Sequence, residues 1–383
     1  MGNYNLSMSA EEKAVYDLLC DDKSKQVFLA RKILTEFGDS EPLRNLFEKP
    51  DGFDEFIDII RNHKYVIYGG GFLCSKFIRI FQTFGAERNL VEIWDKKGNE
   101  LRGKFGDIPV RKYPEKRDFS EFDYIVVAVS PKKNKKVFDE VLNLLADIGI
   151  PSDMILTPYF QLFGLETTYF PPDIIQFQDD EIFIDGGCFD FYTSANFIRK
   201  CSSAGKSVKK VYAFEPDEKL AIVSKENSKQ YPFAEIVTAG LYSKSTTICF
   251  HVSNIERSSF IDENGNQELK VVALDQFIPQ NDRVTFVKMD VEGAELEALR
   301  GMKNIIQRDM PKLAISIYHK PKDYVEIPMY IKILLNIAGQ NNNCSPQVLH
   351  EAPQPMKRYE IIRRMYMRHH SINTDDTILY CVP

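Results

Sequence analysis

The run Phe183-Ile-Asp-Gly-Gly-Cys-Phe-Asp190 decides the fold of the C-terminal half of this chain. It overlaps the apolar stretch Ile182–Asp185, which predicts a buried strand that ends in a carboxylate. Gly186 and Gly187 then predict a tight turn before a helix. In open sheets of parallel strands, ligands bind beyond the carboxyl ends of the strands, where the strand order reverses. Because glycine allows a ligand to approach the backbone closely, we expect Asp185, Gly186 and Gly187 to contact a ligand.

A second acidic residue ends the next predicted strand, Val211–Glu215. The carboxylate of Glu215 suits the two hydroxyl groups of a ribose, in NAD or in S-adenosylmethionine. The turn Asp-Gly-Gly-x-x-Asp, which ends at Asp190, lacks the GxGxxG pattern that binds a pyrophosphate. The carboxylate of Asp185 would repel a diphosphate but would attract an ammonium or sulfonium group. We therefore expect these acidic residues to bind S-adenosylmethionine.

A third acidic motif, Val287-Lys-Met-Asp290-Val-Glu292-Gly-Ala-Glu295, spans the end of the fourth predicted strand. Asp290 is expected to lie across the crevice from the methyl donor, where the acceptor hydroxyl must lie. For methyl transfer, the protein has to align the acceptor oxygen and remove its proton. Asp290 and Glu292 could also recruit Mg²⁺ with a third oxygen ligand, so the need for a divalent metal stays open.

The following predicted strand, Leu313–Tyr318, brings His319 beside Asp290. His319 is the first candidate for the general base, because an unperturbed imidazole titrates near neutral pH. Asp290 is the second candidate, unless it orients His319. His369 and His370 end a later predicted strand, from which one of them could reach the crevice.

Residues 173–383 predict an α/β domain with the seven-stranded sheet of a class I methyltransferase. Five parallel strands with helical crossovers are expected, followed by a terminal antiparallel pair. The further expected strands are 235–239, 284–290, 359–366 and 377–382, and the expected helices are 193–200, 217–230 and 294–307. Gly339–Met356, rich in Asn, Gln and Pro, is expected to form a surface loop or lid.

Several runs in residues 181–383 are similar to those of the FkbM-type methyltransferase family: FIDGGCFD, YAFEPD, VKMDVEGAELEAL, LAISIYHKP, and the closing RHHS followed by TILY. The resemblance implies S-adenosylmethionine as the donor and usually O-methylation. It also implies a small-molecule or glycan acceptor, typically a sugar of a surface glycan or a secondary metabolite. Phe191 departs from the family pattern, which has glycine after Phe-Asp, and its bulk is expected to narrow the methionine end of the pocket.

Two further segments precede this domain. Residues 1–62 predict helices over 11–20, 26–37 and 53–61, which we interpret as a structural cap or a partner surface. Residues 63–160 predict a smaller Rossmann-like domain, because the strand Tyr65–Tyr68 runs into three glycines and a second strand is followed by Asp95. Its glycine pattern is an incomplete GxGxxG, so we favour a non-catalytic or sugar-nucleotide-handling role over bound NAD.

The composition is that of a globular protein, and the net charge of −6 argues against a general nucleic-acid-binding protein. The 7 cysteines are scattered without a CxxC pair, which indicates reduced thiols and no zinc site. No apolar run approaches the length of a membrane span, and we expect a cytoplasmic protein. The sequence does not predict an oligomeric state.

Two other functions are compatible with the sequence. The first is an NAD-dependent oxidoreductase acting on a sugar nucleotide, because Tyr318 and Lys322 have the Tyr-x-x-x-Lys spacing of such enzymes. Pro321 between them disfavours the helix that this pair requires. The second is a catalytically silent binding protein with a methyltransferase fold, for which Phe191 is the motive.

Overall fold

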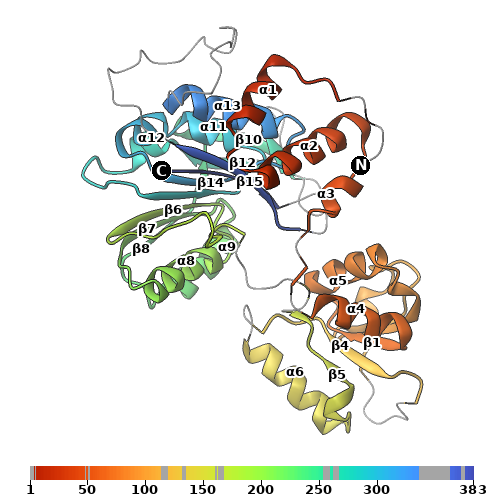
Figure 1. Cartoon of the computed structure of the whole chain (residues 1–383). Helices are drawn as coiled ribbons and strands as arrows, with labels where there is room; N and C mark the ends of the chain where they lie inside the picture. Colours follow the sequence, from red (N-terminus) through yellow and green to blue (C-terminus); the bar gives the residue numbers. More distant parts are fainter. Residues whose placement is uncertain are drawn as a thin grey trace. The chain divides into compact units, whose positions relative to one another are not determined.

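The computed structural model describes residues 4, 6–47, 49–50, 52–113, 120–131, 135–159, 162, 168–252, 259–261, 267–335, 363–371 and 376–383. The chain forms two compact units, Met1–Phe47 with Thr167–Pro383, and Glu48–Glu166 (Figure 1). The helical segment expected over residues 1–62 is therefore divided between the units. Each unit is built around its own sheet.

The larger unit contains a seven-stranded sheet with the order β15-β16-β14-β13-β6-β7-β8. Neighbouring strands are parallel except where β16 pairs with β14 and with β15. The strands are β6 (Glu181–Gly186), β7 (Val208–Phe214), β8 (Ala234–Val237), β13 (Phe286–Met289), β14 (Lys312–Ser316), β15 (Arg364–His369) and β16 (Thr377–Val382). The chain runs from β6 to β8 in one direction and from β13 to β14 in the other, so the order reverses between β6 and β13. The predicted α/β fold with a seven-stranded sheet is confirmed.

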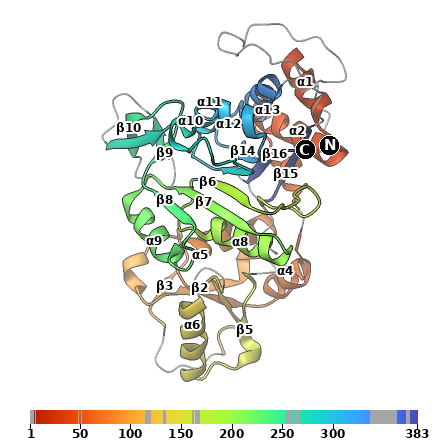
Figure 2. The ribbon, with the colours of Figure 1, turned by 90° about the vertical axis from the view of Figure 1, so that its left-hand side faces the viewer.

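Both faces of this sheet are covered by apolar clusters. Alternate residues of a strand point to opposite faces, so neighbouring residues belong to different clusters. Ile182 and Ile184 of β6 belong to one apolar cluster and Phe183 to the other. On the second face, Phe183 stacks on Phe197 of α8 (Tyr192–Ser203), with ring centroids 4.1 Å apart. Figure 2 shows α8 and α9 (Glu218–Ser228) on one side of the sheet, and α10 to α13 on the other.

The N-terminal helices α1 (Ala10–Leu18) and α2 (Asp22–Phe37) belong to the larger unit, where α2 packs along the edge strand β15. The backbone N–H of Cys20 donates to the carbonyl of Met365 at 3.0 Å, which continues the sheet by one bridge. Covering an edge in this way protects it from pairing with other chains. Arg368 of β15 also pairs with Asp21 at 2.7 Å.

A second contact connects these helices to α13 (Asp323–Leu335). Tyr324 of α13 donates its hydroxyl hydrogen to Glu12 of α1 at 2.8 Å, and Lys32 of α2 pairs with the same carboxylate at 2.8 Å. Lys32 also pairs with Glu36. A short helix, α3 (Glu41–Arg44), follows α2.

The helix expected over 294–307 is two helices, α11 (Glu295–Arg300) and α12 (Lys303–Asp309), so that expectation is wrong in its continuity. Gly301 separates them where the backbone lies so close to Tyr242 that a Cβ atom would overlap the Tyr242 carbonyl oxygen. The carboxylate of Asp275 accepts the backbone N–H groups of Asn304 and Ile305 and so caps α12.

A small four-stranded sheet with the order β11-β10-β12-β9 lies between β8 and β13 in the sequence, where no element was predicted. Its strands, and the short helix that follows them, are β9 (Gly240–Leu241), β10 (Thr246–Val252), β11 (Ser259–Ile261), β12 (Gln267–Val272) and α10 (Leu274–Phe277). The expected strand at 359–366 ends too early, because β15 (Arg364–His369) pairs with β16 as far as His369; residues 359–362 lie outside the described part of the chain. The expected loop Gly339–Met356 lies outside the described residues.

The smaller unit contains a five-stranded parallel sheet with the order β3-β2-β1-β4-β5. Its elements are α4 (Phe53–Asn62), β1 (Tyr65–Tyr68), α5 (Phe72–Thr83), β2 (Leu90–Trp94), β3 (Val110–Arg111), β4 (Tyr124–Val127), α6 (Lys135–Asp147) and β5 (Ile155–Leu156). The carboxylate of Asp95 accepts the backbone N–H of Gly70 at 2.8 Å. A Cβ atom at Gly70 would lie only 2.7 Å from a methyl carbon of Leu101, so that residue closes over the glycine turn.

Among the helices in the described part of the chain, none is both long and apolar enough to cross a membrane. Five cysteines are free thiols: Cys20 is exposed, and Cys74, Cys188, Cys201 and Cys381 are buried. Burial raises the pKa of the Cys74 thiol to about 12.

Candidate functional site

The glycine turn after β6 lies directly against the end of β13. Gly187 has a φ of +73°, and a Cβ atom on it would overlap the carbonyl oxygen of Asp290. The backbone N–H groups of Gly187 and Cys188 both donate to the carbonyl of Phe214 at the end of β7, at 3.0 and 2.9 Å. The turn therefore joins the ends of three adjacent strands, and only glycine fits at position 187.

A buried ion pair lies beneath this turn. Lys288 of β13 places its Nζ 3.0 Å from Asp185 Oδ1, and the two side chains are 2% and 0% exposed. The same ammonium donates to the carbonyls of Gly186 and Gly187, at 2.9 and 2.6 Å. Asp185 Oδ2 accepts the hydroxyl hydrogen of Ser194 at 2.7 Å. Asp185 is therefore buried and pairs with a lysine of the chain itself, and its contact with a ligand stays a prediction.

Glu215 and Asp190 lie on the other side of the turn. Glu215 is 6% exposed and accepts the backbone N–H groups of Phe189 and Asp217, at 2.9 and 3.0 Å. Burial raises the pKa of Glu215 above its usual value, although these hydrogen bonds oppose the shift. Asp190 accepts the backbone N–H of Tyr192 at 3.0 Å, within the first turn of α8. Both acidic residues therefore shape the turn and the start of α8.

Phe191 does not narrow the crevice. Its side chain is 1% exposed and belongs to the apolar cluster under α8, with its ring 5.9 Å from that of Tyr231. Its backbone has a φ of +69°, the left-handed conformation that favours glycine. A non-glycine residue in that conformation costs about 1–2 kcal/mol. The expectation that Phe191 narrows the methionine end of the pocket is corrected, because its side chain lies in the core and the departure from glycine affects backbone strain and core packing.

Asp290 lies at the end of β13 between two tyrosines. Tyr169 donates its hydroxyl hydrogen to Oδ2 at 2.8 Å, and Tyr318 donates to Oδ1 at 3.1 Å. The ring of Tyr169 also covers Lys288, with its centroid 5.2 Å from Nζ. Burial raises the pKa of Asp290, but the charges of Lys288 and His319 and the hydrogen bond from Tyr169 lower it by more, so that the pKa lies below its usual range. The carboxylate is therefore ionised at neutral pH.

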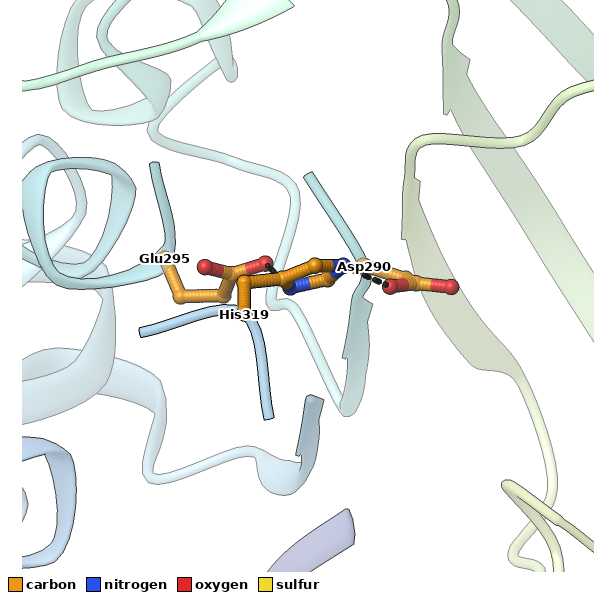
Figure 3. Close-up of side chains that lie close together, drawn as sticks. All are labelled: Asp290, Glu295 and His319. Atoms are coloured by element: carbon orange, nitrogen blue, oxygen red, sulfur yellow. Dashed lines mark ion pairs between the residues drawn. The ribbon is translucent and has the colours of Figure 1, made fainter. Parts of the chain in front are cut away.

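His319 lies between carboxylates on both sides of its ring (Figure 3). Its Nδ1 is 2.9 Å from Glu295 Oε1, and its Nε2 is 3.5 Å from both Asp290 Oδ1 and Glu292 Oε2. Glu295 is 1% exposed, and the same oxygen accepts the N–H groups of Val291 and Gly293, at 3.0 and 3.4 Å. Glu295 therefore fixes both the turn after β13 and the orientation of the imidazole.

These carboxylates change the titration of the imidazole. Burial lowers the pKa of His319, but Glu295, Asp290 and Glu292 together raise it to about 9. This result corrects the expectation of titration near neutral pH, because the sequence does not show how many acidic groups surround the ring. Burial also raises the pKa of the nearby Asp323 to about 6. At pH 7 most of the protein carries a cationic His319.

The same groups are the candidates for a metal site. Asp290, Glu295 and His319 each offer a ligand atom, and these atoms lie within 4.8 Å of one another. Glu295 Oε1 already accepts two backbone N–H groups and faces Nδ1 of the imidazole. A cation that used this oxygen would compete with those contacts.

Comparison with known families identifies part of the larger unit. Residues 186–342 match the Methyltransferase FkbM domain. These residues form an FkbM methyltransferase domain. The hexuronic acid methyltransferase AglP of Haloferax volcanii is 30% identical over 139 residues, which are 35% of this chain and 58% of that protein. The match thus spans less than two thirds of the relative's length.

Two solved structures are also similar. Methyltransferase FkbM from Methylobacillus flagellatus KT has 18% identity and a TM-score of 0.44, covering 94% of this chain and 99% of that chain. An rRNA methylase from Streptococcus thermophilus has 18% identity and a TM-score of 0.30, covering 54% of this chain and 88% of that chain.

Most of the residues predicted for the site lie at or just beyond the ends of the adjacent strands β6, β7, β13 and β14, around the point where the strand order reverses. The exceptions are His369 and His370, which lie against β16: His369 Nδ1 is 3.0 Å from Thr377 Oγ1, and His370 Nε2 is 2.8 Å from the hydroxyl of Tyr380. The Tyr318 and Lys322 pair is not on a helix, because Tyr318 follows β14 and Lys322 precedes α13. The helical arrangement required for the oxidoreductase is therefore absent at these residues.

Sequence reasoning missed Lys288, Glu295 and Tyr169. Lys288 and Glu295 lie inside the motif of the FkbM domain, and a lysine in the middle of an apolar strand was a signal that it is paired. Tyr169 lies between the two predicted domains, and no local sequence pattern connects it with Asp290. Its role depends on a contact between segments far apart in the sequence.

We expect Gly187→Ala to destabilise the protein much more than Gly205→Ala. Gly205 has a similar φ of +68°, but a Cβ atom there meets nothing within 4 Å, so this control measures the backbone cost alone. That cost is about 1–2 kcal/mol, whereas the overlap with Asp290 should bring the loss at Gly187 above about 3 kcal/mol. Urea denaturation of both variants measures the difference. Equal losses would show that the close approach of the turn to β13 is not rigid.

Proposed function

We propose that this chain is an S-adenosylmethionine-dependent O-methyltransferase that acts on a sugar. The observation that carries the proposal is the position of His319 at the end of β14, with Nδ1 facing Glu295 and Nε2 facing Asp290 (Figure 3). A carboxylate on one side of an imidazole fixes its orientation and leaves the other nitrogen to accept a proton. This geometry lies beside the glycine turn of an FkbM methyltransferase domain.

The residues around the glycine turn suit S-adenosylmethionine. Glu215 offers a carboxylate for the ribose hydroxyls, and Gly186 and Gly187 allow the donor to approach the backbone. Asp185 acts through Lys288 in this proposal, holding the turn in place, and Asp190 supports the first turn of α8. The donor, when bound, supplies an electrophilic methyl group on a sulfonium.

The acceptor class is supported by the relative AglP, whose name is hexuronic acid methyltransferase. In the proposed reaction, an acceptor oxygen forms a bond to the methyl carbon while the carbon–sulfur bond breaks and its electron pair stays on sulfur. The proton of the acceptor hydroxyl moves to His319 Nε2. Asp290 stabilises the resulting imidazolium, whose Nε2 lies 3.5 Å from its carboxylate. His319 can accept this proton only when it is neutral.

We expect His319→Ala to reduce kcat at least about 100-fold while changing donor affinity less than about threefold, because general-base catalysis contributes roughly 10²–10⁴-fold. Transfer of labelled methyl to hexuronic acid acceptors would measure kcat, and calorimetry would measure donor binding. His63→Ala is the matched control, since His63 is an exposed histidine of the smaller unit. An unchanged kcat in His319→Ala would remove His319 from the mechanism. Failure of the unaltered protein to bind S-adenosylmethionine would overturn the proposed function.

We expect kcat/KM to rise with pH up to about 9. The pKa of His319 in the protein without substrate is about 9, and only the neutral imidazole accepts a proton. Glu295→Gln should move this rise to lower pH by about one unit or more. The charge of Glu295 raises the pKa of His319, so removing that charge should lower the pKa. Glutamine still offers an oxygen to the N–H groups of Val291 and Gly293. A profile that is flat from pH 6 to 9 in the unaltered protein would contradict the assignment.

We expect EDTA to leave the rate unchanged within about twofold, because Glu295 is committed to backbone N–H groups and to His319 and is a poor metal ligand in this arrangement. The measurement compares initial rates before and after chelation, with Mg²⁺, Mn²⁺ and Zn²⁺ added back separately. A loss of rate that one of these ions restores would instead support a metal at Asp290 and His319.

A further inference from the structure

A cavity of about 260 Å³ lies between α2 and the end of β14. Arg31 and Thr35 of α2 line one side, while Tyr318, His319 and Lys320 line the other. The cavity therefore shares His319 with the candidate site, and Gly186 and Gly187 are not among the residues that line it. The side of the cavity that α2 forms lies outside residues 186–342, the part of the chain that matches the FkbM domain.

The position of α2 is fixed by contacts on both sides of Arg31. Before it, Ser24 accepts the backbone N–H of Met367 at 3.0 Å. After it, Lys32 pairs with Glu12, which also accepts a hydrogen bond from Tyr324 beside the cavity. Arg31, on the same helix, is 6% exposed. A helix held in this way presents Arg31 at a defined place, as a binding residue requires.

The charged groups that line the cavity are all cationic or able to become so. Arg31, His319 and Lys320 line it, and its described lining contains no aspartate or glutamate. A largely buried arginine presents a planar fork of N–H donors that matches the two oxygens of a carboxylate. Lys320 is exposed and adds a second, mobile positive charge at the rim.

We propose that this cavity binds the carboxylate of an acidic sugar acceptor, with Arg31 as the main anion-binding residue and Lys320 assisting. This inference rests on the proposed function, and it assigns to the N-terminal helix a part in acceptor specificity. The volume of about 260 Å³ is below the roughly 300–1,000 Å³ usual for whole small-molecule ligands, so the cavity suits a single sugar unit. A carboxylate at Arg31 leaves the rest of that sugar in a cavity that His319 also lines.

The test is direct titration of the full chain with glucuronate, glucose and glucose 6-phosphate, in which binding is measured by calorimetry or ligand-observed NMR. Glucuronate should bind about 10- to 100-fold more tightly than glucose, the ratio expected for one charge-assisted contact. Arg31→Gln should abolish this preference, and Arg31→Lys should restore part of it. Arg283→Gln is the matched control, because Arg283 is an exposed arginine of the same unit and does not line the cavity.

A second variant covers the case in which Arg31→Gln does not fold. Thr35 is exposed at the cavity wall, so Thr35→Trp should fill the cavity without disturbing the core and should weaken glucuronate binding at least about tenfold. Equal binding of glucuronate and glucose by the unaltered protein would overturn the inference, as would full preference retained in Arg31→Gln. Tighter binding of glucose 6-phosphate than of glucuronate would overturn the carboxylate assignment.

A parallel titration with S-adenosylhomocysteine, the demethylated donor, separates this inference from the proposed function. We expect all four variants to bind it within about threefold of the unaltered protein, because the cavity does not include the glycine turn. Donor binding without a preference for glucuronate would reject the carboxylate site and leave the methyltransferase assignment standing. A preference for glucuronate without donor binding would reject the methyltransferase assignment and leave the carboxylate site standing.

Discussion

The buried pair of Lys288 and Asp185 is the interaction on which the candidate site depends. Its two side chains are almost fully removed from water, and the ammonium also donates to the carbonyls of both glycines of the turn. Burial lowers the pKa of Lys288, but the charges of Asp185 and Asp290 raise it by more. The net pKa lies above its usual value, so the lysine stays charged. Removing one member of a buried pair leaves the other charge uncompensated, which typically costs about 3–5 kcal/mol. The pair thus holds β6, β13 and the glycine turn in one geometry.

Backbone strain is concentrated at the two turns that this pair connects. Phe189 and Phe191 have positive φ values in the first turn, and Glu292 has one in the second, although none of these residues is glycine. Such residues cost about 1–3 kcal/mol each and persist only where the surrounding structure fixes them. Here the fixing contacts are identifiable: Glu215 accepts the N–H of Phe189, and Glu295 accepts N–H groups on both sides of Glu292.

Charge separates the two sides of the proposed reaction centre. Carboxylates surround His319 on the side of β13, and the cavity beyond it is lined by Arg31 and Lys320. In the proposed function, the cationic donor therefore lies near acidic groups and the anionic acceptor near basic ones. Opposite potentials of this kind orient two ligands with little need for movement of the protein. His319 belongs to both sides, which explains how one residue can receive a proton and contact the acceptor.

The sequence by itself determined the class of the seven-stranded sheet, the order along the chain of most of its strands and the acidic residues at the strand ends. These follow from local periodicity and glycine chemistry, which act over a few residues. Only the tertiary structure decided that Asp185 faces Lys288, that Phe191 points into the core and that His319 has a pKa of about 9. It also brought Tyr169 to Asp290 and placed Arg31 at the cavity wall. Each of these depends on which distant segments pack together, because burial and neighbouring charge are properties of the folded chain.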